Sequence, residues 1–291
     1  MSIEVNYREN GMSGMPIGTN PDLIRSGWVT EEIGEMTPFL YRGELMLFGS
    51  AKSEAEANPF GERCLWIENV ASRRVATTFA RGYGLGSAYC EGHAAYVYAI
   101  PNDSRGANHI DCFISHDMSI WSKHTVLKAL PGEELFNESI CKAGDRYIMA
   151  YESRDARYPP FTIFFAESND LINWMRIPGA VYGTDRYTAC PTIRFIDGMF
   201  YMLYLEHLKP AWWFETYVAR STDLIHWEQG SKNPVLKPEG AEDINASDVD
   251  LVESDGKVFV YYAYGDQKSS GAVTWAEYEG PLPEFFRFYF S

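Results

Sequence analysis

The sequence is short of positive charge and has no long apolar run. Its 291 residues hold 25 Lys and Arg against 40 Asp and Glu, which gives a formal net charge of −15. Such a field repels phosphate backbones and anionic lipid, so nucleic acid and membrane surfaces are disfavoured as partners. No run of 18 apolar residues occurs, and no transmembrane helix is predicted.

Paired cysteines and a leader peptide are missing as well. The cysteines are odd in number and form no C-x-x-C pair, which favours reduced thiols. They are Cys64, Cys90, Cys112, Cys141 and Cys190. Residues 1–20 are polar, with scattered Gly and Pro and no apolar stretch of the kind found in secretory signals. Together these features predict a cytoplasmic protein.

Common motifs of nucleotide and hydrolase sites are also lacking. The sequence contains no P-loop, no G-x-G-x-x-G, no H-E-x-x-H and no G-x-S-x-G. Nucleotide binding, dinucleotide binding and serine-hydrolase chemistry therefore have no support. What the sequence does contain is repetition.

One repeat has the pattern S-x-D-[L/M]-x-x-W. It occurs three times, and its aspartates, Asp117, Asp170 and Asp223, are each 53 residues apart. Each copy follows a short apolar stretch that reads as a strand, namely Ile110–Ile114, Thr162–Ala166 and Thr216–Ala219. We expect the Ser and Asp side chains to hydrogen-bond the turn and the Trp to pack between neighbouring units.

A second repeat consists of a strand, a turn with Gly and an aromatic strand. Its five copies are 49 to 58 residues apart. They are Thr37–Phe48, Ser87–Ile100, Glu138–Tyr151, Cys190–Leu205 and Asp248–Tyr264. No window of 11 or more residues keeps a helical period, and β-branched and aromatic residues dominate. Four strands repeated five times predict an all-β fold, a five-bladed β-propeller.

The ends of the chain are assigned with respect to this ring. Residues 1–27 are predicted to be an N-terminal extension, through which a homo-oligomer could form, and residues 28–291 a single propeller domain. The segment Trp28–Glu32 is the candidate for the strand that closes the ring. Blade five is expected to end at Phe285–Phe290.

Side chains of the innermost strands are expected to line the central channel. The aligned entry positions are Thr37, Gly86, Glu138, Cys190 and Asp248, and the positions on the same face are Glu35, Ile140, Thr192, Arg194 and Asp250. Four carboxylates (Glu35, Glu138, Asp248 and Asp250) therefore converge on one mouth. Such carboxylates can supply acid and base to a sugar acetal. The alternative is structural, with Asp250 and Arg194 forming only an ion pair.

The ends of the second strands and the loops after the fourth strands border the same mouth. These positions are Asn102, Asp103, Arg105, Glu152, Ser153, Arg154, Asp185, Arg186, Glu206, His207, Asp266 and Gln267. His207 is suited to proton transfer near neutral pH, although a loop His bonded to a carbonyl is the plain alternative. Trp212, Trp213 and Phe214 are candidates for a platform on which a sugar ring stacks.

With five blades, hydrophobic inner strands and the S-x-D-L-x-x-W turns, the sequence resembles the five-bladed propeller glycoside hydrolases of families 43, 32, 68, 62 and 117. Residues 218–228 (VARSTDLIHWE), followed by Asn233–Leu236, carry the resemblance most clearly, and it extends over residues 28–290. It implies a glycosidase of the family 43 or family 117 kind. Similarity to family 117, whose members use a histidine as the acid, implies that role for His207.

We therefore predict an exo-acting glycosidase on small oligosaccharides. The predicted catalytic residues are Glu35, Glu138, Asp248 and His207; the predicted substrate-binding residues are Thr37, Arg154, Asp185, Arg186, Arg194, Glu206, Trp212, Trp213, Asp250 and Gln267. The sequence assigns no cofactor, and a divalent cation in the channel, on Asp248, Asp250 or His207, remains open. Blade four has Cys190 where family 43 has an acid, so three alternatives remain open. One is phosphorolysis, with phosphate held by Arg154, Arg186 and Arg194. The others are elimination by a lyase and sugar binding without catalysis.

Overall fold

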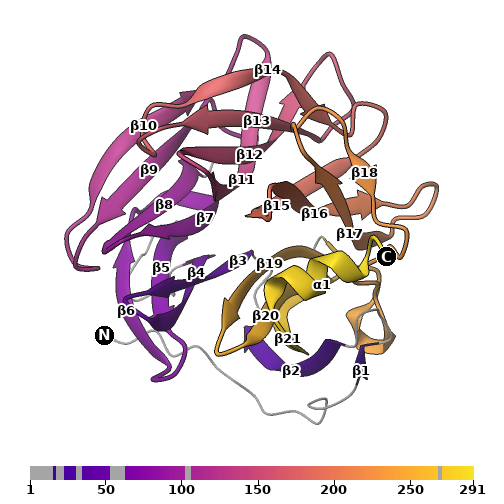
Figure 1. Cartoon of the computed structure of the whole chain (residues 1–291). Coiled ribbons are helices and arrows are strands. Elements are labelled where there is room, and N and C mark those ends of the chain that lie inside the picture. Colours follow the sequence, from indigo (N-terminus) through magenta and orange to yellow (C-terminus); the bar gives the residue numbers. More distant parts are fainter. Residues whose placement is uncertain (1–15, 18–22, 31–34, 53–62, 102–105, 268–270) are drawn as a thin grey trace.

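The computed structural model describes residues 16–17, 23–30, 35–52, 63–101, 106–267 and 271–291. Its strands form five sheets arranged around a central axis (Figure 1). The protein is a five-bladed β-propeller, as the repeats predict. The strands of blades one to four are β3 (Met36–Tyr41), β4 (Glu44–Lys52), β5 (Arg63–Asn69), β6 (Arg74–Phe79), β7 (Tyr83–Glu91), β8 (Ala94–Pro101), β9 (His109–Ser115), β10 (Ser122–Lys128), β11 (Glu133–Ala143), β12 (Arg146–Asp155), β13 (Thr162–Ser168), β14 (Met175–Tyr182), β15 (Thr188–Ile196), β16 (Met199–His207), β17 (Phe214–Ser221) and β18 (Glu228–Gln229).

Blade five joins the two ends of the chain. Its strands are β19 (Ala246–Ser254), β20 (Lys257–Gly265), β21 (Gly271–Glu279), β2 (Leu23–Thr30) and β1 (Pro16–Ile17). The indigo strand β2 lies antiparallel to the yellow strand β21, and this pairing closes the ring (Figure 1). The predicted closing strand is thus confirmed, although it begins at Leu23 rather than at Trp28.

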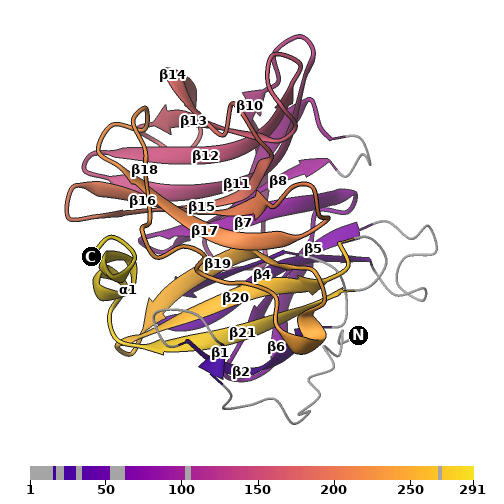
Figure 2. The same cartoon turned by 90° about the vertical axis from the view of Figure 1, so that its right-hand side faces the viewer.

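The C-terminal segment is helical, not the end strand of blade five. After the short 3₁₀ helix η1 (Gly240–Glu242), the single α-helix of the described residues is α1, Leu282–Phe288. Pro281 precedes it, and Phe285, Phe286 and Tyr289 form one fully buried face at helical spacing. Figure 2 shows α1 at the edge of one face of the ring. With seven residues, this helix is too short to cross a membrane.

The hydrophobic core lies between neighbouring blades. Separate clusters fill the contacts between blades one and two, two and three, three and four, four and five, and five and one. The fully buried Tyr98 of blade two, for example, meets the ring of Trp174 of blade three edge-on and donates its hydroxyl proton to the Leu171 carbonyl at 2.8 Å. The aromatic second strands and the repeat Trp residues therefore hold the ring together.

The S-x-D turns have the predicted structural role. In the copy at residues 168–174, Asp170 Oδ1 accepts hydrogen bonds from the Ile172 and Asn173 backbone N–H groups, at 3.0 and 2.7 Å. Ser168 Oγ accepts from the Leu171 N–H at 3.0 Å. The copies at residues 115–121 and 221–227 repeat the Asp contacts. The turns stand at the end of the blades where the first two strands form their hairpin.

Asp170→Ala is expected to lower the free energy of unfolding by about 1 kcal/mol, because two backbone N–H groups lose their acceptor. The same contacts lower the pKa of Asp170 from 3.8 to about 2. A lowered pKa means that the contribution is present above pH 4 and is lost as the pH falls towards 2. Urea unfolding of Asp170→Ala and wild type at pH 7 and pH 2.5 measures this; the exposed Asp145→Ala is the control. A difference that persists unchanged at pH 2.5 contradicts the assignment.

Candidate active site

The channel has a small cavity at the end where the inner strands begin. Its volume is about 30 Å³, room for about one water molecule. It is lined by Glu35, Met36, Thr37, Gly86, Asn137, Glu138, Cys190, Pro191, Thr192, Asp248, Val249 and Asp250. All five blades contribute to this lining, as the aligned entry positions predict.

Irregularities in the inner strands turn the functional side chains into this cavity. The pairing of β15 with β16 slips between Ala189 and Thr192, and that of β19 with β20 slips between Ser247 and Asp250. Cys190 and Asp248 stand within these bulges with left-handed backbones, φ +48° and +53°. That conformation costs an L-residue about 1–2 kcal/mol, and bulges of this kind re-aim side chains next to active sites.

Blade two contributes no carboxylate, and its geometry shows why. At Gly86 a Cβ atom would lie 2.2 Å from the Tyr98 carbonyl oxygen, so no larger side chain fits this entry position. The next residue, Ser87, donates its backbone N–H to Glu138 Oε1 at 3.1 Å. This bond joins blade two to blade three across the channel.

Asn137 holds two carboxyl groups and a thiol together. Its Nδ2 lies 2.7 Å from Glu35 Oε1, 3.4 Å from Glu152 Oε2 and 3.1 Å from Cys190 Sγ. The backbone N–H of Cys190 also donates to Glu152 Oε2, at 3.0 Å. Blades one, three and four thus meet at one point through side-chain contacts.

Asp248 completes the group from blade five. One oxygen each of Glu35 and Asp248 and the sulfur of Cys190 all lie within 4.8 Å of one another. Gln267 Nε2 donates to Asp248 Oδ2 at 3.2 Å, so the predicted Gln267 does reach the site. Four carboxyl groups, those of Glu35, Glu138, Glu152 and Asp248, therefore gather around the mouth of the channel.

Burial dominates the protonation of these groups. It raises the pKa of Glu138 well above the ordinary value and that of Glu152 to about 8. Burial and the neighbouring Asp248 charge raise the pKa of Glu35 well above its ordinary value. The pKa of Asp248 is also raised by burial, against hydrogen bonds from Cys190, Gln267 and Ser247 that favour its ionised form. Asp248 is thus the member whose ionised form receives the most support from hydrogen bonds.

Glu152 is the residue whose importance the sequence did not reveal. It is 4% exposed and belongs to the second strand β12, not to an inner strand. Sequence reasoning placed it only at the border of the mouth, and Asn137 was not considered. The signal available for Glu152 was its place at the end of an aromatic second strand, the same criterion that selected Glu206 and His207.

His207 does not reach the carboxyl groups. Its ring stacks on Phe214 at 4.8 Å and its Nε2 lies 3.0 Å from the Ala211 carbonyl oxygen. It is one member of an aromatic rim, in which neighbouring rings are in contact from blade three to blade four. The rim residues are Phe136, Phe161, Tyr187, His207, Trp212 and Phe214. His207 therefore has the contacts of a histidine bonded to a backbone carbonyl, which was the plain alternative to a proton donor. Trp212 is 45% exposed and forms the solvent-facing part of the rim.

The remaining predicted binding residues are held by other protein groups. Arg186 pairs with Glu206 and with the largely exposed Asp185, each at 2.9 Å. Arg154 pairs with Glu134 at 2.7 Å while its guanidinium covers the rings of Phe136 and Phe161. Trp213 donates to Glu215 at 3.0 Å, and Thr37 is a buried lining residue. Asn102, Asp103 and Arg105, and most of residues 1–27, lie outside the described part of the chain.

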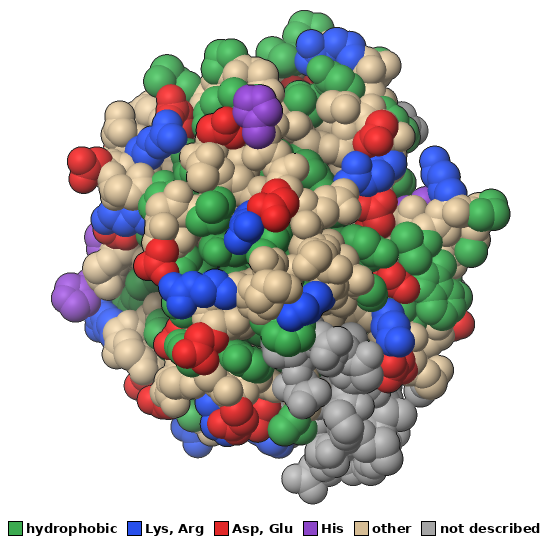
Figure 3. All heavy atoms as spheres, turned by 45° about the vertical axis from the view of Figure 1, so that its right-hand side comes forward, with side chains coloured by type: hydrophobic (Ala, Val, Ile, Leu, Met, Phe, Trp, Pro, Cys, Tyr) green, Lys and Arg blue, Asp and Glu red, His purple; other side chains and the backbone are tan. Residues whose placement is uncertain are grey.

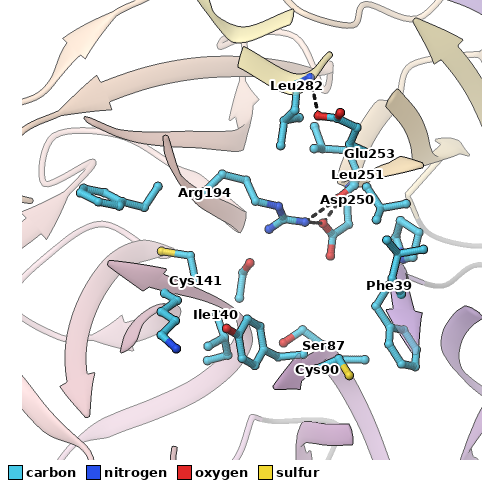
Figure 4. Close-up of a pocket in the computed structure, with 18 residues that line it drawn as sticks. Phe39, Ser87, Cys90, Ile140, Cys141, Arg194, Asp250, Leu251, Glu253 and Leu282 are labelled. Carbon is cyan, nitrogen blue, oxygen red and sulfur yellow. Dashed lines mark hydrogen bonds and ion pairs between the residues drawn. The ribbon is translucent and has the colours of Figure 1, made fainter. Parts of the chain in front are cut away.

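Asp250 and Arg194 form an ion pair inside the channel, as the structural alternative proposes. Arg194 Nη2 lies 2.5 Å from Asp250 Oδ1 and 2.6 Å from the Leu251 carbonyl oxygen. Figure 4 shows the pair in a second cavity, of about 330 Å³, further along the inner strands. Asp250 lines both cavities, so the pair lies between them. Arg154, Arg186 and Arg194 are therefore each paired with a different carboxylate and do not form one phosphate site.

The net charge of −15 is not concentrated on the outer face seen in Figure 3, where acidic and basic side chains alternate. The carboxyl groups of the cavity differ from these surface charges. Among the described residues, none of Glu35, Glu138, Glu152 and Asp248 forms an ion pair with Lys or Arg. The Arg63 charge lowers the pKa of Glu35 and the Arg154 charge that of Glu152, in both cases against the larger effect of burial. Buried acids without paired cations are typical of functional sites.

No family model and no curated protein matches this sequence. Solved structures do match. A thermostable family 43 glycoside hydrolase superposes with a TM-score of 0.65 at 14% identity, covering 89% of this chain and 90% of that one. A member of the GH130 family, in which mannoside phosphorylases and hydrolases of β-1,2-mannosidic linkages in Candida mannan occur, gives 0.62 at 14% identity, covering 94% and 90%. An N-acetylgalactosamine deacetylase from F. plautii, in complex with blood group B trisaccharide, gives 0.63 at 12% identity, covering 97% of each chain. At such identities the likeness establishes the fold, which this chain has in common with several kinds of carbohydrate-active enzyme.

Proposed function

We propose that the protein is a glycoside hydrolase that removes a terminal sugar from small oligosaccharides at this channel mouth. The observation that carries the proposal is the convergence of Glu35, Glu138 and Asp248 on one cavity, beside which Glu152 is bonded to the lining residues Asn137 and Cys190. Hydrolysis of an acetal needs a carboxylic acid and a carboxylate side by side in one site. The likeness to hydrolases and other sugar-processing propellers supports the same class of substrate.

Glu152 is the proposed proton donor. Its Oε2 accepts two hydrogen bonds, from Cys190 N–H and from Asn137 Nδ2, which leaves the other carboxyl oxygen to carry a transferable proton. Asp248 is the proposed base, because Gln267 holds it by a hydrogen bond that favours a carboxylate. Glu35, beside both, is proposed to orient the water that the small cavity can hold.

Glu138 and His207 take other roles in this proposal. Glu138 is 3% exposed and bonded to the Ser87 backbone, and it supports the wall of the cavity. His207 belongs to the aromatic rim, on which a sugar ring can stack. This assignment replaces the expectation, implied by the resemblance to family 117, that His207 is the acid.

The test is turnover on a panel of aryl glycosides and short oligosaccharides, with and without inorganic phosphate. Release of free sugar without phosphate is the expected result. Turnover that requires phosphate would assign phosphorolysis instead, for which Arg154 is the one predicted phosphate ligand at the rim. An unsaturated product would assign elimination, and binding measured by calorimetry without turnover would leave only a sugar-binding propeller.

Trp212→Ala is expected to raise KM by about threefold to tenfold with little change in kcat, because a stacked ring contributes about 0.5–1.5 kcal/mol beyond its buried area. Steady-state kinetics on the best substrate of the panel measures the effect. Ile225→Ala, a similarly exposed residue in the turn at the other end of blade four, is the control. An unchanged KM would remove Trp212 from the binding surface.

A further inference from the structure

The sulfur of Cys190 stands among carboxylate oxygens at separations typical of ligands on one metal ion. Glu35 Oε1 and Glu152 Oε2 each lie 3.8 Å from Cys190 Sγ. The Asp248 oxygen is within 4.8 Å of both Sγ and the Glu35 oxygen. A tetrahedral zinc ion, with Zn–S of about 2.3 Å and Zn–O of about 2.1 Å, separates a sulfur from an oxygen ligand by about 3.6 Å. Small side-chain movements would therefore complete such a site.

The donor set selects the kind of ion. A thiolate is a soft ligand that favours zinc and similar transition metals, whereas magnesium and calcium prefer oxygen alone. Cys190 is the cysteine in this cavity; Cys90 and Cys141 line the second cavity, further along the channel. The choice between thiophilic and hard cations therefore depends on one residue.

A second observation points to a missing ligand in the same place. Two buried polar atoms of the cavity lining, Asn137 Oδ1 and Glu138 Oε2, have no hydrogen-bond partner among the described residues. Both residues are more than nine-tenths buried, at 6% and 3% exposure. Atoms of this kind signal an unfilled water or ion position. Asn137 also contacts both Glu35 and Cys190, as residues that orient metal ligands do.

We propose that Glu35, Cys190 and Asp248 bind one thiophilic divalent cation of the zinc type, with water in the fourth position. Binding replaces the thiol S–H bond by a metal–sulfur bond and releases that proton, together with any proton on the Glu35 carboxyl group, to solvent. The proposal deepens the proposed function, because it concerns the regulation of the same site. Carboxylates that hold an ion cannot act as acid and base, so the loaded protein is expected to be inactive as a glycosidase.

The experiment titrates the full-length, EDTA-treated protein with Co²⁺ and records its absorption spectrum. We expect a thiolate-to-cobalt charge-transfer band in the near ultraviolet and the visible bands of tetrahedral cobalt, saturating at one equivalent. Zn²⁺ is expected to abolish both, and Mg²⁺ and Ca²⁺ to have no effect. Cys190→Ser is expected to remove the charge-transfer band, and Cys90→Ser, the matched control, to keep it.

A further variant and a measurement of folding distinguish the loss of a metal ligand from misfolding of the protein. Asn137→Ala leaves all three protein ligands in place and is expected to weaken Co²⁺ binding about 10-fold to 100-fold. Circular dichroism establishes that each variant is folded. Absence of the charge-transfer band in wild type, or its persistence in folded Cys190→Ser, overturns the proposal.

Activity measurements separate this proposal from the hydrolase assignment. Turnover in EDTA that is lost with Zn²⁺ and restored by chelation supports both. A cobalt spectrum without any turnover in EDTA supports the metal site and contradicts carboxyl acid–base catalysis by the metal-free protein. Turnover without metal binding leaves the hydrolase and removes the metal site.

Discussion

Glu152→Gln is expected to lower kcat by about 10³-fold on substrates with a sugar leaving group, within the range that a general acid contributes. The amide is nearly isosteric and can still accept from the Cys190 N–H, but it carries no transferable proton. Burial raises the pKa of Glu152 to about 8, so the carboxyl group of the wild type holds its proton at neutral pH. The free energy of unfolding is expected to change little.

The leaving group identifies the acid. A dinitrophenyl glycoside departs without protonation, so Glu152→Gln should retain most of its activity on that substrate and lose it on oligosaccharides. Steady-state kinetics on both substrates, in EDTA, measures the ratio. The control is Glu167→Gln, a half-buried carboxylate on the adjacent strand β13 that pairs with Arg146. An equal loss on both substrates would mean that Glu152 does not donate the proton.

The architecture could be predicted because the same pattern of strands and turns occurs several times in the sequence. The turn pattern around Asp117, Asp170 and Asp223 marks equal units, and each copy forms the same local hydrogen bonds. Local patterns of this kind need no knowledge of distant residues. The C-terminal helix was not predicted because Phe285–Phe290 is almost entirely apolar and aromatic, so its sequence shows no alternation of polar and apolar residues. The helical spacing of its buried face becomes evident only where it packs on the core of blades four and five.

The site could be predicted only in part, because bulges decide which side chains enter the channel. The alignment of the inner strands placed Glu35, Glu138 and Asp248 at the mouth, and all three line the small cavity. Strict alternation does not describe Cys190 and Asp248, which stand in left-handed conformations within bulges. Nor can it reveal that Glu152, from another strand, shares the Asn137 amide with Glu35, 102 residues away from Asn137 in sequence.

The ion pairs formed by the arginines argue against the alternative that the protein is a phosphorylase. Arg186 and Arg194 each have a carboxylate partner, Glu206 and Asp250, and lie in different parts of the molecule. A phosphate ion would have to displace these partners before it could be held. The water that hydrolysis consumes, in contrast, fits the cavity among the carboxyl groups, which has a volume of about 30 Å³.

Asp248→Ala is expected to lower kcat by about 10³-fold or more and to be partly restored by added formate or azide. The truncation removes the carboxylate best supported as ionised, and a small anion can occupy the vacated volume and act in its place. Unlike Glu152→Gln, this variant should lose activity on the dinitrophenyl glycoside as well, because an activated leaving group does not replace the base. Kinetics with increasing formate, in EDTA, measures the recovery.

Asp250→Ala provides the control from the same strand. Its carboxylate is bonded to Arg194 and the Leu251 backbone, so its removal leaves a partly buried guanidinium without its ion-pair partner. We expect Asp250→Ala to lose stability, as removal of one partner of a buried pair does, and to show no rescue by formate because its role is structural. If formate restores the activity of Asp250→Ala and not that of Asp248→Ala, the base is Asp250, the ion-pair partner of Arg194, and catalysis takes place further along the channel.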